Sequence, residues 1–193
     1  APLEALEFSR ELAAKEGLHA VPSFHPWLVR GVATYGLELF RSVADIDVVF
    51  VPVGLGSGFC GIAAAREALG LQTKIVGVVS AHAPAYALSF QQRQFVEQSS
   101  TTRVAEGVAC KTPDKDALEH ILQHAHEIVT VNDDEAVVAM REIIQATHNI
   151  AEGAGALAYA ALKKHREQWQ GKRAACVLTG GNASMSLLAR ALA

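Results

Sequence analysis

A short apolar run that leads straight into a glycine-rich turn constrains the fold more than any other stretch of this sequence. Residues 47–53, Asp-Val-Val-Phe-Val-Pro-Val, are mostly apolar and β-branched, which is typical of a strand buried on both faces of a parallel sheet. Four glycines follow within the next eight residues, and a helix is predicted from about Gly58 to Leu69. A strand that ends in such a loop and opens a helix indicates an α/β fold.

The rest of the chain alternates between strand-like and helix-like stretches. Further strands are predicted at residues 18–21, 74–79, 128–131 and 174–178. Further helices are predicted at residues 3–16, 26–43, from Thr112 as N-cap onward, 132–147 with Asn132 as N-cap, 153–168, and after residue 182. This spacing predicts three layers, with a mostly parallel, twisted sheet covered by helices on both faces. Residues 80–110 favour no particular element.

Composition narrows the class of protein. Of the 193 residues, 50% are hydrophobic and 19% are charged, enough apolar material for one large α/β domain. The net charge is −3 without a basic stripe, which argues against a nucleic-acid partner. The three cysteines are far apart and lack zinc-site spacing. No signal peptide or membrane-length apolar run is present, so we expect a cytoplasmic protein without a membrane partner.

Three interpretations of the glycine loop at 54–61 are open from the residues alone. Gly56, Gly58 and Gly61 match the dinucleotide pattern GxGxxG, but the strand at 74–79 is not followed by the acidic residue that holds the ribose. The glycines could also serve only a tight turn and close helix packing. The third interpretation is a phosphate site, because backbone N–H groups and a helix N-terminus gather there.

Four segments of the chain resemble one known family. Residues 51–61, VPVGLGSGFCG, resemble the glycine loop of fold-type-II pyridoxal-phosphate enzymes, particularly the serine/threonine dehydratase (ammonia-lyase) branch. VAEGV at 104–108, AEGAGA at 151–156 and LTGGN at 178–182 follow in the order of that branch, and residues 22–36 are similar too. The resemblance covers nearly the whole chain. It implies a tryptophan-synthase-β-like fold, with residues 1–22 as the tail of a small substrate domain and residues 23–193 as the C-terminal part of the large cofactor domain.

The resemblance implies a role for eight residues toward pyridoxal 5'-phosphate. The phosphate would be bound by the backbone amides of Gly54, Leu55, Gly56, Ser57 and Gly58. Because the branch often has glycine in place of Leu55, that side chain should point away from the phosphate. The Thr179 hydroxyl would bond the pyridine nitrogen, and Gly107 and Glu152 would lie beside the ring.

Simpler roles remain open for some of these residues, and others are expected to have none. Thr179 could instead cap the last helix, and Glu152 could be a first-turn carboxylate favoured by the helix dipole. No metal site is expected, since Val79 stands where some relatives of the branch have an acidic cation ligand. We expect three histidines to be solvent-facing helix residues: His120, His124 and His126.

The lysine that forms a Schiff base with the cofactor has no counterpart here. Seven lysines lie in charged or helical surroundings and are expected to face solvent: Lys15, Lys74, Lys111, Lys115, Lys163, Lys164 and Lys172. We therefore expect a fragment that is inactive alone, with the missing N-terminal half of its enzyme and a second identical subunit as partners.

The resemblance implies that the whole enzyme eliminates water and then ammonia from a small β-hydroxy amino acid, L-serine or L-threonine, to give a 2-oxo acid. Two alternatives stay open: a β-replacing enzyme similar to cysteine synthase, and a non-catalytic nucleotide-binding domain.

Overall fold

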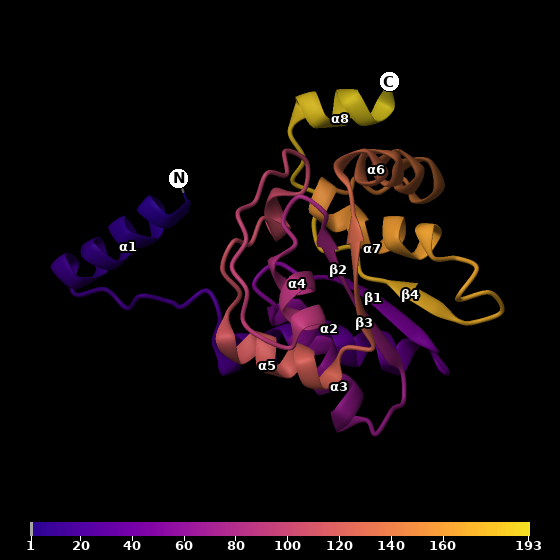
Figure 1. The fold of residues 1–193 in the computed structure, drawn as a ribbon, viewed down its shortest axis with the longest axis horizontal. Helices are drawn as coiled ribbons and strands as arrows, with labels where there is room; N and C mark the ends of the chain where they lie inside the picture. Colours follow the sequence, from indigo (N-terminus) through magenta and orange to yellow (C-terminus); the bar gives the residue numbers. More distant parts are fainter. Residues whose placement is uncertain (1) are drawn as a thin grey trace.

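A single parallel sheet forms the centre of the computed structural model, which describes residues 2–193, with side chains from residue 7 onward. Its strands are β1 (Val48–Pro52), β2 (Lys74–Ser80), β3 (Glu127–Val131) and β4 (Ala174–Cys176). They lie in the order β3-β2-β1-β4, and each neighbouring pair is parallel. The predicted α/β class with a parallel sheet is therefore confirmed (Figure 1).

Alternate residues of β1 face two separate cores, as the two-residue period of a strand requires. Val48 and Phe50 lie in a core with α6 (Asp133–Thr147), α7 (Gly153–Lys164) and α8 (Met185–Leu192), whereas Val49 and Val51 lie in a core with α2 (Pro26–Ser42), α3 (Ser57–Ala68) and α5 (Lys115–His124). The sheet is thus the middle of three layers. All five residues of β1 are buried, which explains their uniformly apolar character.

Several predicted elements need correction. Residues 18–21 form no strand; Leu18 and Val21 are exposed, and no neighbouring strand in the described part of the chain supplies backbone partners. The helix expected to start at Thr112 starts at Lys115, because the Asp114 side chain accepts from the N–H groups of residues 116 and 117 and so acts as the N-cap. The last strand and the helix from 153 are shorter than predicted, ending at Cys176 and Lys164.

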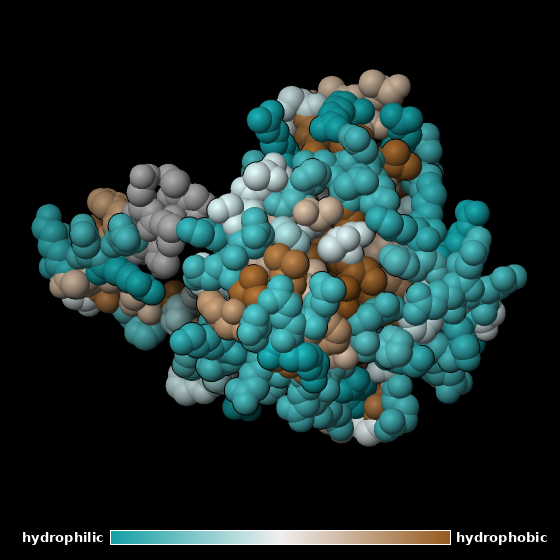
Figure 2. Space-filling model, in the orientation of Figure 1, coloured by the Kyte–Doolittle hydropathy of each residue, from teal (hydrophilic) through white to brown (hydrophobic). Residues whose placement is uncertain are grey.

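Residues 80–110 contain two short helices that no sequence pattern indicates. They are α4 (Ala85–Gln92) and the 3-10 helix η1 (Glu106–Val108). The helix α1 (Pro2–Glu16) ends before Gly17, whose positive φ of 64° fits the predicted C-cap. Figures 1 and 2 show α1 projecting from the rest of the molecule, and its Phe8 is exposed. Within residues 2–193, no helix combines the length and apolar character needed to cross a membrane.

Candidate functional site

The loop after β1 leaves backbone N–H groups without protein acceptors. Gly56 is the N-cap of α3, with a φ of 100°, and no side chain caps this helix end. The Cys60 N–H, which donates to the Gly56 carbonyl oxygen at 2.9 Å, is the first to bond within the helix. The N–H groups of residues 57–59 precede it and bond to no residue that the structure describes. This end of α3 is therefore suited to an anion.

Two buried tyrosines contact the same loop through its carbonyl oxygens. The Tyr35 hydroxyl donates to the Gly58 carbonyl oxygen at 2.9 Å, and the Tyr86 hydroxyl donates to the Leu55 carbonyl oxygen at 2.9 Å. The Asp114 N–H donates to the Tyr86 hydroxyl oxygen at 3.0 Å. Burial raises the pKa of both phenols. No sequence signal indicates these contacts, since each tyrosine lies more than 20 residues from its carbonyl partner.

The segments at 104–108, 151–156 and 178–182 meet beside this loop. A β-carbon added to Gly54 would lie 2.6 Å from the Gly107 carbonyl oxygen. The Glu152 N–H donates to the Gly180 carbonyl oxygen at 3.0 Å, and Glu152 Oε1 lies 3.4 Å from the position of a β-carbon on Gly107. Four segments that are far apart in the sequence thus form one continuous region at the carboxyl ends of the strands.

The side chains of Glu152 and Thr179 are both available in this region. Glu152 is the N-cap residue of α7, but its carboxylate makes no capping hydrogen bond. Thr179 is exposed and does not cap α8, whose N-cap is Ser184. The helix-capping alternative for Thr179 is therefore wrong. Leu55 is 40% exposed.

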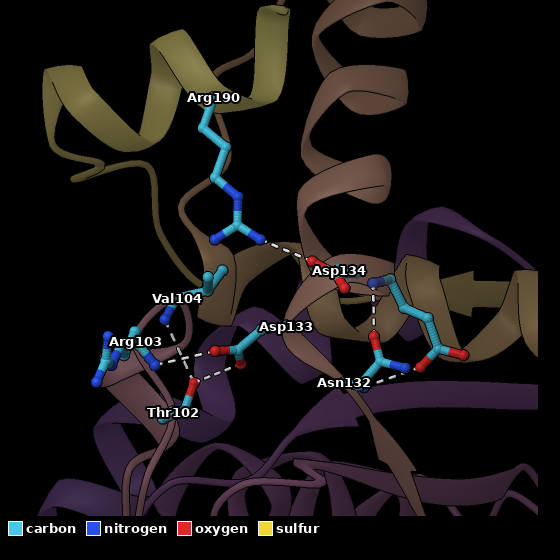
Figure 3. Close-up of polar contacts among 8 residues, drawn as sticks. Thr102, Arg103, Val104, Asn132, Asp133, Asp134 and Arg190 are labelled. Carbon is cyan, nitrogen blue, oxygen red and sulfur yellow. Dashed lines mark hydrogen bonds and ion pairs between the residues drawn. The ribbon is translucent and has the colours of Figure 1, made fainter.

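The N-terminus of α6 holds two flanks of the region in place (Figure 3). Asp133 accepts hydrogen bonds from the Thr102 hydroxyl at 2.7 Å and from the Arg103 N–H at 3.0 Å. Asp134 forms an ion pair with Arg190 of α8 at 2.7 Å. The predicted N-cap Asn132 is confirmed, with a reciprocal pair of 2.8 Å bonds to Glu135. A run of three acidic residues after an N-cap was the available sequence signal.

A cavity of about 380 Å³ lies between these flanks. Its lining includes Gly107, Glu152, Asn182, Ser184 and both arginines of the preceding contacts. Polar groups therefore border the region on the side away from the α3 loop.

One predicted exposed histidine is instead packed. His120 and His126 are exposed, but the His124 side chain is only 9% exposed. Its Nδ1 lies 3.1 Å from Arg66 Nη2 and 3.5 Å from Glu67 Oε1. Burial lowers the His124 pKa, Arg66 adds to the effect, and Glu67 opposes it. The seven lysines are all exposed as predicted. Among the described residues, no group of three or more His, Cys, Asp or Glu side chains could hold a metal ion.

Comparison with known proteins identifies relatives along nearly the whole chain. The family model described as "Pyridoxal-phosphate dependent enzyme" matches residues 2–180. The L-threonine ammonia-lyase of Thermotoga maritima is 30% identical, over 97% of this chain and 47% of the relative. The catabolic L-threonine dehydratase of Escherichia coli K12 is 31% identical, over 91% of this chain and 54% of the relative. The chain thus spans about half the length of these curated relatives.

Solved structures show the same fold. The processed form of threonine deaminase isoform 2 from Solanum lycopersicum superposes with a TM-score of 0.88 at 29% identity, covering 94% of this chain and 54% of that one. A second threonine deaminase, from a bacterial source abbreviated T.th., gives a TM-score of 0.84 at 27% identity, covering 91% of this chain and 66% of that one. The predicted tryptophan-synthase-β-like fold is confirmed by this likeness.

Proposed function

Because the chain belongs to the family of pyridoxal-phosphate dependent enzymes, we propose that it is the cofactor-binding part of an ammonia-lyase. The whole enzyme would eliminate water and then ammonia from a small β-hydroxy amino acid, L-threonine or L-serine, and release a 2-oxo acid. The names of the relatives, threonine ammonia-lyase and threonine dehydratase, support this class over β-replacement.

The observation that carries the proposal is the set of free N–H groups at the start of α3. A phosphate dianion could bind there without a lysine or arginine, because several N–H groups and the positive end of the helix dipole act together. Gly54 supplies the necessary room: its α-carbon is in contact with the Gly107 carbonyl, and no side chain separates the two segments. These features fit the phosphate of the cofactor.

The remaining proposed contacts concern the pyridine ring. When bound, pyridoxal phosphate supplies a ring that withdraws electrons from the α-carbon of the amino acid. Thr179 offers a neutral hydroxyl to the ring nitrogen, and such a group does not hold a proton there as a carboxylate would. Gly107 and Glu152 would border the ring. Together these residues bind and orient the cofactor, and none of them transfers the α-proton.

The base for that proton transfer would come from another part of the protein. All seven lysines of this chain are exposed, and none is among the residues that meet in the region described above. We therefore propose that the lysine is on the remaining half of the enzyme. A homodimer located in the cytoplasm remains our prediction for the assembled enzyme.

The test has a binding arm and an activity arm. Titration of the chain with pyridoxal phosphate, followed by calorimetry and by amide NMR, should show weak binding that shifts the resonances of residues 54–59. The chain alone should produce no 2-oxo acid, whereas the enzyme that contains it should release 2-oxo acid and ammonia from L-threonine or L-serine. Preferential binding of NAD or AMP at these amides would contradict the proposal, as would the absence of 2-oxo acid from the assembled enzyme.

A further inference from the structure

We propose that Tyr35 and Tyr86 are positioning residues for the cofactor phosphate: they hold two carbonyl oxygens of the loop so that the adjoining N–H groups face the anion. This inference rests on the proposed cofactor site. It assigns a role to two buried hydroxyl groups that are not themselves part of that site.

The planarity of the peptide bond connects each tyrosine to an N–H group. In a trans peptide the carbonyl of one residue and the N–H of the next point in opposite directions, and the described chain contains no cis peptide. Tyr86 fixes the Leu55 carbonyl, which directs the Gly56 N–H away from Tyr86. Tyr35 fixes the Gly58 carbonyl, which directs the Phe59 N–H away from Tyr35. Each hydroxyl thus sets the direction of one proposed phosphate donor.

The direction of the Tyr86 hydrogen bond is determined by its second partner. The Asp114 N–H can only donate, so the Tyr86 hydroxyl oxygen accepts from it. The single phenolic proton is then committed to the Leu55 carbonyl. Tyr86 is 1% exposed, and burial raises the pKa of its phenol, so this donor proton is retained at physiological pH.

The two tyrosines reach the loop from different elements. Tyr35 is on α2 and Tyr86 is on α4, and between them they contact both ends of the segment from residue 55 to residue 58. Packing supports the same arrangement from α5, since a β-carbon on Gly56 would lie 2.7 Å from Ala117 Cβ. The loop is therefore held in one shape before any ligand arrives, which lowers the cost of ordering it on binding.

Replacing each tyrosine by phenylalanine tests this role, because the ring remains and only the hydroxyl is lost. We expect Tyr35→Phe and Tyr86→Phe each to weaken inorganic phosphate binding about 5- to 10-fold, the effect of one hydrogen bond, with pyridoxal binding unchanged. In the ligand-free chain, amide exchange should accelerate at Phe59 in the first variant and at Gly56 in the second.

The third tyrosine supplies a matched control. Tyr159 is on α7, where its hydroxyl bonds to Glu142, and Tyr159→Phe should leave phosphate affinity and the exchange of the loop amides unchanged. If the chain binds phosphate and both loop variants bind it as tightly as wild type, the tyrosine proposal fails alone. An equal loss in all three variants also overturns it. If wild type itself does not bind phosphate or pyridoxal phosphate, the proposed cofactor site fails and the tyrosine proposal fails with it.

Discussion

The Gly107 carbonyl oxygen lies directly against the α-carbon of Gly54, so that a β-carbon at position 54 would stand 2.6 Å from it. This contact joins the first residue of the loop after β1 to the 3-10 helix η1. Real β-carbons do not approach a carbonyl oxygen so closely, and the neighbour here is backbone that cannot simply rotate away. The contact therefore makes position 54 a sensitive probe of the region.

Gly54→Ala should destabilise the chain and weaken cofactor binding. The added methyl forces the loop or η1 to move, and overpacking of this kind costs about 1–3 kcal/mol. Urea unfolding measures the loss of stability, and calorimetry measures the affinity for pyridoxal phosphate. Gly31→Ala is the control: no atom lies within 4 Å of its added β-carbon, and alanine favours the α2 helix by up to about 1 kcal/mol. Equal stability of the two variants would contradict the close contact.

Thr179→Val should weaken pyridoxal phosphate binding about 10-fold while leaving the free energy of unfolding nearly unchanged. The valine keeps the shape but cannot hydrogen-bond the ring nitrogen, and Thr179 is exposed and caps no helix. Thr179→Ser keeps the hydroxyl and should retain the affinity. Calorimetric titration distinguishes the two variants. If valine and serine bind equally well, the proposed contact with the pyridine nitrogen is excluded.

Glu152→Ala separates a role in the cofactor site from a role in helix stability. The carboxylate makes no capping bond and its Oε1 lies close to Gly107 and Gly180, so we expect weaker cofactor binding with a small change in stability. A helix-dipole role would instead cost about 0.3–1 kcal/mol of stability with affinity preserved. Thermal unfolding and calorimetry, performed on the same variant, measure the two quantities.

The packing of His124 should make stability depend on pH. Because the pKa of His124 is lowered from 6.5 in the folded chain, the unfolded chain binds this proton more tightly. The contribution to stability is therefore present above pH 6.5 and is lost as the pH falls through the folded pKa. His124→Gln should remove this part of the fall, measured by urea unfolding between pH 5 and pH 8. If wild type and the variant lose stability in parallel over that window, the assignment to His124 is wrong.

The strands β1, β2 and β3 could be predicted to within two residues because they are buried and β-branched. Residues 18–21 have a similar local composition, but a strand also needs a neighbour, and local sequence does not show which segments become neighbours. The short helix α4 lacks a clear apolar period. It depends on tertiary contacts such as the burial of Tyr86.

The candidate site divides in the same way. The resemblance indicated the glycine loop, Gly107, Glu152 and Thr179 because each lies in a recognisable short motif. The hydroxyl contacts of Tyr35 and Tyr86 and the ion pair of Asp134 with Arg190 join residues 23, 31 and 56 positions apart. Such pairings become visible only once the chain is folded.

The start of α6 gives the two flanks of the cavity a common anchor. One carboxylate, Asp133, secures the backbone that leads into η1, and the next, Asp134, secures α8 through Arg190. Fraying of a single helical turn would therefore release both flanks at once. Entry to and exit from the space beside Glu152 would then follow the breathing of that one turn, and access would open and close as a concerted event with one rate.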